Sequence, residues 1–124
     1  MMTLVDQGLV DLDAPLDRYV PQLRGIDVKT PLTVRHCFVH TNGLQLDIIP
    51  PRMFNDHYGD EMNDYEEVVA GYYPYLKVGT RHGYNGCGYA IAGKAIEQIT
   101  GEALPQFFQK HMWGPLGCPN TDEI

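Results

Sequence analysis

A glycine-rich loop that leads directly into an amphipathic helix, at residues 79–100, constrains the fold of this chain most strongly. Four glycines fall between residues 79 and 88, so the backbone there can turn tightly or adopt positive φ at several points. Tyr84 lies in the middle of this loop, where a rigid neighbouring element can hold its phenol in a cleft. From Gly88 the pattern becomes helical, and Gly101 is placed to end the helix. The apolar positions recur at helical spacing and are Tyr89, Ile91, Ala92, Ala95, Ile96 and Ile99.

The remaining segments predict further short helices, long loops and few strands. With 124 residues, the chain is expected to form a single domain, 1–124, that is mainly α. Residues 45–61 carry no periodic pattern and are expected to form a long loop. In the first half of the chain, we expect a helix that stops near Gly8 and a short helical turn between residues 11 and 21, which starts at Pro15 and ends at Pro21. Thr33 is expected to cap a helix that runs to about Thr41. Two further helices are expected, one from residue 63 or 64 to before Pro74, and one over residues 104–112 that finishes at Gly114 and Pro115.

The composition argues against some classes of function. The net charge is −7 and no basic stripe is present, so the sequence does not predict a nucleic-acid-binding protein. No apolar run is long enough to cross a membrane, and the first residues do not have the pattern of a signal peptide, so the sequence assigns no compartment. The three cysteines, Cys37, Cys87 and Cys118, cannot all pair with one another and are expected to be reduced.

Four blocks of the chain resemble motifs of one enzyme family, in the order in which that family has them. Residues 84–93, YNGCGYAIAG, are similar to Y-S-N-x-G-Y-x-L-L-G, and residues 32–44, LTVRHCFVHTNGL, are similar to I-T-V-R-H-L-L-T-H-T-S-G-L. Residues 7–16, QGLVDLDAPL, resemble E-x-G-K-L-x-L-D-D-P-V, and residues 114–121, GPLGCPNT, resemble D-P-L-G-M-x-x-T. The family is that of the serine β-lactamase-related hydrolases, which includes class C β-lactamases, D-alanyl-D-alanine peptidases, penicillin-binding proteins and related esterases.

The resemblance implies that the chain covers the helical subdomain of an α+β fold, with the antiparallel sheet outside it. The family acylates a serine in a Ser-x-x-Lys motif, because positions i and i+3 share one helix face. The chain contains no serine, and Lys29, Lys77, Lys94 and Lys110 all lack a hydroxyl residue three positions earlier. The chain therefore looks like a fragment or truncated homologue that is inactive alone. The parent would hydrolyse a small ester, amide or β-lactam without a cofactor.

The resemblance assigns one catalytic residue to this chain, which is Tyr84. A phenol has a reference pKa of about 10, so it acts as a base near neutrality only where cations stabilise the phenolate. Where the family has Tyr-Ser-Asn, this chain has Tyr84, Asn85 and Gly86. The substrate-binding amide of the family is thus replaced by glycine, and Asn85 is the candidate to contribute an amide from one position earlier. This departure favours ester hydrolysis over β-lactam hydrolysis.

Two alternatives stay open from the sequence. The chain could be a stand-alone, non-catalytic module that binds a partner or forms a homo-oligomer, because a subdomain separated from a sheet exposes an apolar face. His36 and His40 are four residues apart with Cys37 adjacent, which is compatible with a zinc site. However, no HExxH glutamate lies between them, and the family also has packed histidines at both positions. We therefore predict no metal site.

Overall fold

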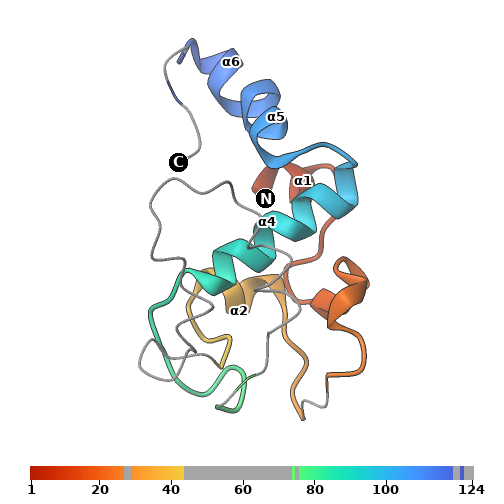
Figure 1. Ribbon diagram of the computed structural model, residues 1–124, viewed down its shortest axis with the longest axis vertical. Coiled ribbons are helices and arrows are strands. Elements are labelled where there is room, and N and C mark those ends of the chain that lie inside the picture. Colours follow the sequence, from red (N-terminus) through yellow and green to blue (C-terminus); the bar gives the residue numbers. More distant parts are fainter. Residues whose placement is uncertain (27–28, 44–73, 75, 119–120, 122–124) are drawn as a thin grey trace.

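The computed structural model describes residues 1–26, 29–43, 74, 76–118 and 121 (Figure 1). Within these residues the chain is helical, and its β pairing is one isolated bridge between Pro15 and Thr33. The prediction of a mainly α chain is thus confirmed. The expected helix that ends before Pro74 and the expected loop at 45–61 lie outside the described residues.

Helix α4, Cys87–Thr100, crosses the middle of the molecule and packs on α2 (Figure 1). Its end is as predicted: Gly101 has φ +69°, and its N–H donates to the carbonyl of Glu97. The predicted apolar face forms the core contact of the helix through Ile91, Ala92, Ala95 and Ile96, which are all buried. Tyr89 differs, because it is 49% exposed and packs edge-on against Phe38, with ring centroids 5.2 Å apart.

Helix α2, Val34–Phe38, begins as predicted but is shorter than predicted. Thr33 caps it in a capping box, in which the His36 N–H donates to the Thr33 hydroxyl and the Thr33 N–H donates to Nδ1 of His36. The helix ends at Phe38 instead of continuing to Thr41. The chain turns at His40, which has φ +55°, so that residues 40–43 can pair with the loop that precedes α4.

The C-terminal helical run is longer than predicted. It comprises α5, Leu104–Phe108, a π-helical turn, Gln109–Trp113, and α6, Gly114–Leu116. The Gly114 N–H donates to the carbonyl of Gln109, and a Cβ atom at Gly114 would lie only 2.6 Å from that oxygen. The glycine therefore permits the wide turn, and Pro115 fits the first turn of α6, where its missing N–H is not needed.

The N-terminal segment contributes many of the buried side chains of the core. Helix α1, Met2–Asp6, ends before Gly8, whose φ of +72° fits the predicted stop. Two 3₁₀ turns follow, η1, Leu16–Arg18, and η2, Pro21–Leu23, so Pro21 starts a second turn although we expected it to end the first. Pro15 precedes η1 as its N-cap instead of taking the first helical position. The buried apolar side chains of this segment are Leu4, Val10, Ala14, Leu16, Tyr19, Val20 and Leu23.

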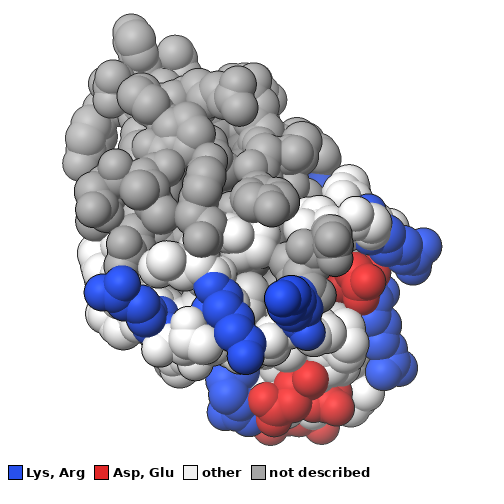
Figure 2. Space-filling view, turned by 90° about the horizontal axis from the view of Figure 1, so that it is seen from below, with Lys and Arg blue, Asp and Glu red and all other residues white. Residues whose placement is uncertain are grey.

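No helix among the described residues has the length and hydropathy needed to span a bilayer. On the face shown in Figure 2, Lys and Arg side chains lie around a smaller group of acidic side chains over the described part of the surface.

The burial of the cysteines leads to a prediction about thiol reactivity. Cys37 and Cys87 are buried in the core, whereas Cys118 is partly exposed. Burial raises the pKa of the Cys37 thiol to about 12 and also raises the pKa of the Cys87 thiol. Because the thiolate is the reactive form, we expect 5,5′-dithiobis(2-nitrobenzoate) at pH 8 to label Cys118 rapidly in the folded chain. Cys37 and Cys87 should become reactive only in denaturant; rapid labelling of all three thiols without denaturant would contradict this burial.

Candidate active-site loop

The loop that carries Tyr84 is held against residues 40–43 by backbone hydrogen bonds. The carbonyl oxygen of Gly43 accepts from the Leu76 N–H at 3.0 Å, and that of Thr41 accepts from the Gly79 N–H at 2.8 Å. Further along, the carbonyl oxygen of His40 accepts from the Gly83 N–H, also at 2.8 Å. These bonds tie the loop to the segment after α2 at three points. The loop is therefore positioned by the helical core.

Two asparagine side chains fasten the same segments from within. The amide of Asn42 donates to Oδ1 of Asn85 at 3.1 Å, and the amide of Asn85 donates back to Oδ1 of Asn42 at 3.2 Å. Asn42 is 0% exposed and Asn85 is 1% exposed. The Asn85 amide also donates to the carbonyl of Gly83 at 2.6 Å, and its Oδ1 accepts from the Gly88 N–H at 3.3 Å. These bonds compensate for burying two amides, which would otherwise be costly.

The start of α4 approaches α2 very closely at Gly88. A Cβ atom at this position would lie 2.7 Å from the Cys37 carbonyl oxygen and 2.7 Å from Nδ2 of Asn42. Only a residue without a side chain fits there without a rearrangement. The glycine therefore allows α4, α2 and the asparagine pair to meet at one point.

Tyr84 differs from its neighbour because its side chain lies at the surface, with 70% of it exposed. Its ring packs against the imidazole of His40, with centroids 4.7 Å apart. The same imidazole also contacts the rings of His82, at 5.7 Å, and Tyr89, at 5.4 Å. The structure thus brings the predicted catalytic residue to the tip of an anchored loop, whereas Asn85 lies beneath it.

An apolar groove of about 800 Å³ begins beside this loop. It runs along α4 between the start of α1 and the helical run that begins with α5, which Figure 1 shows on the same side of the molecule. Its lining residues are Met1, Met2, Thr3, Phe38, Gly86, Tyr89, Ala90, Ala92, Gly93, Ile96, Leu104, Phe108 and Met112.

The two histidines of the zinc alternative make separate contacts. His36 bonds to Thr33 in the capping box, and burial lowers the pKa of its imidazole. His40 lies in the aromatic cluster at Tyr84. Within the part of the chain that the structure describes, no three His, Cys, Asp or Glu side chains form a group able to hold a metal ion.

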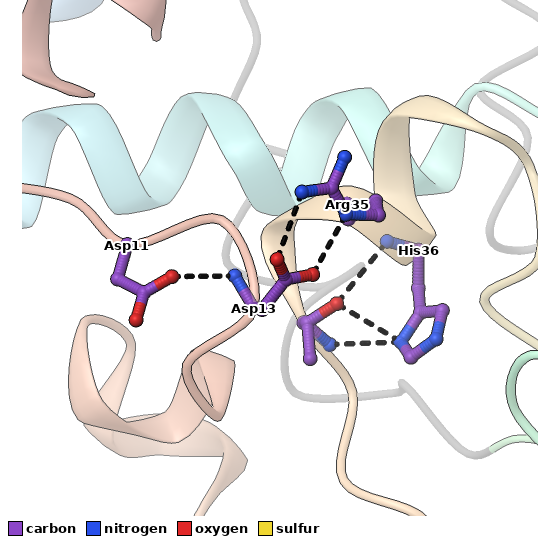
Figure 3. Close-up of polar contacts among 5 residues, drawn as sticks. Asp11, Asp13, Arg35 and His36 are labelled. Atoms are coloured by element: carbon purple, nitrogen blue, oxygen red, sulfur yellow. Dashed lines mark hydrogen bonds and ion pairs between the residues drawn. The ribbon is translucent and has the colours of Figure 1, made fainter. Parts of the chain in front are cut away.

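A surface ion pair stands beside the capping box (Figure 3). The Arg35 guanidinium donates to both carboxylate oxygens of Asp13, at 2.7 and 2.8 Å, and this keeps the pKa of the Asp13 carboxyl below its usual value. Asp11 in turn accepts from the Asp13 N–H. The pair links two of the motif blocks, because Asp13 belongs to residues 7–16 and Arg35 to residues 32–44. Both side chains are solvent-exposed, so the contribution of the pair to stability is small.

The sequence indicated Tyr84 and Asn85 but not the residues that hold them. The sequence indicates His40 only as a packed histidine or an alternative metal ligand, and no pattern in it predicts the buried partner of Asn42. A residue that pairs across 43 positions leaves no periodic signal in the sequence. The local indication in the sequence is that His40 and Asn42 lie within three residues of Gly43. This glycine has φ +83° in the structure and marks the turn at which their segment ends.

Comparison with known proteins gives one consistent result. The profile of the family described as Beta-lactamase matches residues 1–122. A lovastatin esterase from Penicillium rubens is 27% identical, and the match covers 94% of this chain and 34% of that protein. Among solved structures, EstCE1, a hydrolase with promiscuous acyltransferase activity, matches with 25% identity and a TM-score of 0.73, over 92% of this chain and 33% of that one. The octameric penicillin-binding protein homologue from Pyrococcus abyssi matches with 28% identity and a TM-score of 0.72, over 94% of this chain and 28% of that one. The chain thus spans about a third of the length of the relatives it matches.

Proposed function

This chain belongs to the β-lactamase family, and on that premise we propose that it supplies the tyrosine-bearing helical part of a serine acyl hydrolase. The observation that carries the proposal is the placement of Tyr84 at the exposed tip of a loop that backbone and asparagine bonds anchor to the core. In the resemblance of residues 84–93 to the family motif Y-S-N-x-G-Y-x-L-L-G, Tyr84 matches the first tyrosine. The nucleophilic serine is contributed by residues other than these 124, which contain none.

The proposed reaction has two halves in which Tyr84 moves one proton. The Tyr84 phenolate accepts the proton of the serine hydroxyl while the serine oxygen forms a bond to the substrate carbonyl carbon. The resulting phenol then donates that proton to the departing alcohol or amine, which leaves an acyl-serine. Water releases the acyl group through the same proton transfers in reverse order. Cations beside the phenol are required, and the lysine of the Ser-x-x-Lys motif is the proposed source.

We propose an ester as the preferred substrate. Gly86 stands where the family motif has asparagine, so that position offers no side-chain amide for the amide carbonyl of a substrate. The Asn85 amide, which was the sequence-based candidate for substrate binding, lies 1% exposed in its pair with Asn42. Its proposed role is therefore to hold Tyr84 in place.

The proposal is tested by comparing the chain alone with the chain in a complete fold. The purified 124-residue chain is expected to hydrolyse neither p-nitrophenyl acetate nor nitrocefin faster than buffer. A chimera in which this chain replaces the matched third of EstCE1 is expected to hydrolyse p-nitrophenyl acetate and to leave nitrocefin nearly unchanged. Turnover by the isolated chain would contradict the assignment of the nucleophile to another segment. A chimera that is folded by circular dichroism, but inactive on esters, would contradict the proposed function.

A second candidate function is a non-catalytic module that associates through the groove along α4. The observation that favours it is the apolar lining of this groove, a feature found at surfaces where proteins associate. Sedimentation velocity separates the candidates: a concentration-dependent oligomer with no activity in the chimera supports the module, and an isolated monomer with an active chimera supports the hydrolase.

A further inference from the structure

We propose that His40 is a positioning residue for Tyr84, holding both the phenol ring and the backbone that follows it. The inference rests on the proposed function, because it concerns how the tyrosine of that site is oriented. It starts from three contacts of one residue: a ring contact with Tyr84, a side-chain hydrogen bond to Asn85 and a backbone hydrogen bond to Gly83. His40 therefore contacts Tyr84 and both of its chain neighbours.

The side-chain hydrogen bond fixes the protonation form that His40 needs. The Asn85 N–H donates to Nδ1 of His40 at 3.4 Å, so Nδ1 must carry a free lone pair. A neutral imidazole with Nδ1 free carries its proton on Nε2. The contact therefore requires the neutral Nε2–H form, and an imidazolium could not accept this bond.

The ring contact sets the orientation of the phenol. The centroids of His40 and Tyr84 lie 4.7 Å apart with a 46° angle between the ring planes, within the range of favourable aromatic pairs. Since 70% of Tyr84 is exposed, few other contacts are available to restrict its side-chain torsions. The same imidazole also contacts the rings of Tyr89 and His82, at centroid distances of 5.4 and 5.7 Å.

The backbone of His40 is itself unusual. Its φ of +55° is the one positive value at a non-glycine residue within the described part of the chain. A left-handed conformation at a residue with a Cβ atom is unfavourable and persists where the surroundings require it. Here the conformation directs the His40 carbonyl toward the Gly83 N–H and the imidazole toward Tyr84. A glycine at this position would relieve the strain, but it would provide neither the ring that contacts Tyr84 nor the Nδ1 atom that accepts from the Asn85 N–H.

Two substitutions separate the two side-chain roles. His40→Asn tolerates the left-handed conformation and retains an acceptor near the position of Nδ1, but it removes the ring. His40→Phe retains a ring against Tyr84 but removes the acceptor. His82→Ala is the matched control, because it removes an imidazole that contacts His40 from the same loop, whereas the Asn85 N–H donates to His40.

The test uses nuclear magnetic resonance on the 124-residue chain, so it does not depend on activity. In the unsubstituted chain, the nitrogen shifts of His40 should show an unprotonated Nδ1 and a protonated Nε2. His40→Phe should raise the hydrogen-exchange rate of the Asn85 amide about tenfold, which corresponds to the loss of one hydrogen bond. His40→Asn should leave that rate within about threefold and move the Tyr84 ring shifts toward those of a free tyrosine. His82→Ala should leave both observables nearly unchanged.

The outcomes distinguish this inference from the proposed function. A protonated Nδ1 in the unsubstituted chain, or unchanged Tyr84 shifts and Asn85 exchange in both His40 variants, would overturn the positioning role. In the EstCE1 chimera, the His40 variants should lower kcat about tenfold or more at a similar KM, since a misplaced catalytic group affects the chemical step. If the resonance effects are present and the unsubstituted chimera is inactive, His40 does position Tyr84 and the proposed function fails. If the chimera is active and unaffected by the His40 substitutions, the positioning role fails and the hydrolase assignment remains.

Discussion

Replacing Tyr84 by phenylalanine is expected to lower ester turnover by the EstCE1 chimera about 10²–10⁴-fold, the usual contribution of a positioned acid–base group. The substitution removes only the phenolic oxygen and keeps the ring that packs against His40. The loop should therefore stay in place while the serine loses its proton acceptor and the leaving group loses its proton donor. The measurement is kcat and KM for p-nitrophenyl acetate. We expect the loss in kcat, with KM changed little.

The matched control for this substitution is Tyr89→Phe. Tyr89 lies five residues further along, contacts the same imidazole and is also partly exposed, at 49%. Removing its hydroxyl keeps its ring contacts with Phe38 and His40. Its kcat should remain within a few-fold of the unsubstituted chimera. Equal losses in the two variants, or no loss in Tyr84→Phe, would show that the Tyr84 phenol does not transfer the proton.

The parts of the fold that the sequence predicted are those with local causes. Helix α4 was predicted because its apolar spacing repeats over four turns and Gly101 can adopt positive φ at its end. The start of α2 was predicted because Thr33 caps it from the adjacent position. For both helices, neighbouring residues are sufficient to determine the structure. Tyr84 was expected in a cleft, but its side chain is 70% exposed and is not among the residues that line the groove along α4.

The parts that could not be predicted depend on residues far apart in the chain. Helix α2 ends three residues early because residues 40–43 bond to a loop that begins more than thirty positions later. The burial of Asn85 follows from a partner 43 positions away, so its amide could not be distinguished from a substrate-binding amide by sequence. Likewise, the role of His40 depends on contacts with Tyr84 and Asn85, which no spacing within residues 32–44 reveals. The candidate residue was therefore predictable, and the residues that support it were not.

Replacing Gly88 by valine is expected to cause the largest loss of stability, about 3 kcal/mol or more. The first added atom would lie 2.7 Å from the Cys37 carbonyl oxygen, 3.0 Å from Cys37 Cα and 2.7 Å from Nδ2 of Asn42. Backbone atoms of α2 cannot move aside as a flexible side chain can, so α4 and α2 would have to separate. For a domain of this size, the expected fall in melting temperature is roughly 10–15 °C, measured by circular dichroism.

The same substitution should also disturb the proposed site, because Gly88 contacts the asparagine pair. The Gly88 N–H donates to Oδ1 of Asn85, and a displaced Asn42 would leave the Asn85 amide without one of its partners. We therefore expect the side-chain amide resonances of Asn42 and Asn85 to shift well below the melting transition. Gly86→Val is the matched control: a Cβ atom at Gly86 would meet no heavy atom within 4 Å, and φ there is −79°. Its cost should stay below about 1 kcal/mol, the usual scale of an unfavourable helix N-cap. Similar melting temperatures for the two valine variants would contradict the close approach of α4 to α2 at Gly88, and with it the anchoring of the loop that carries Tyr84.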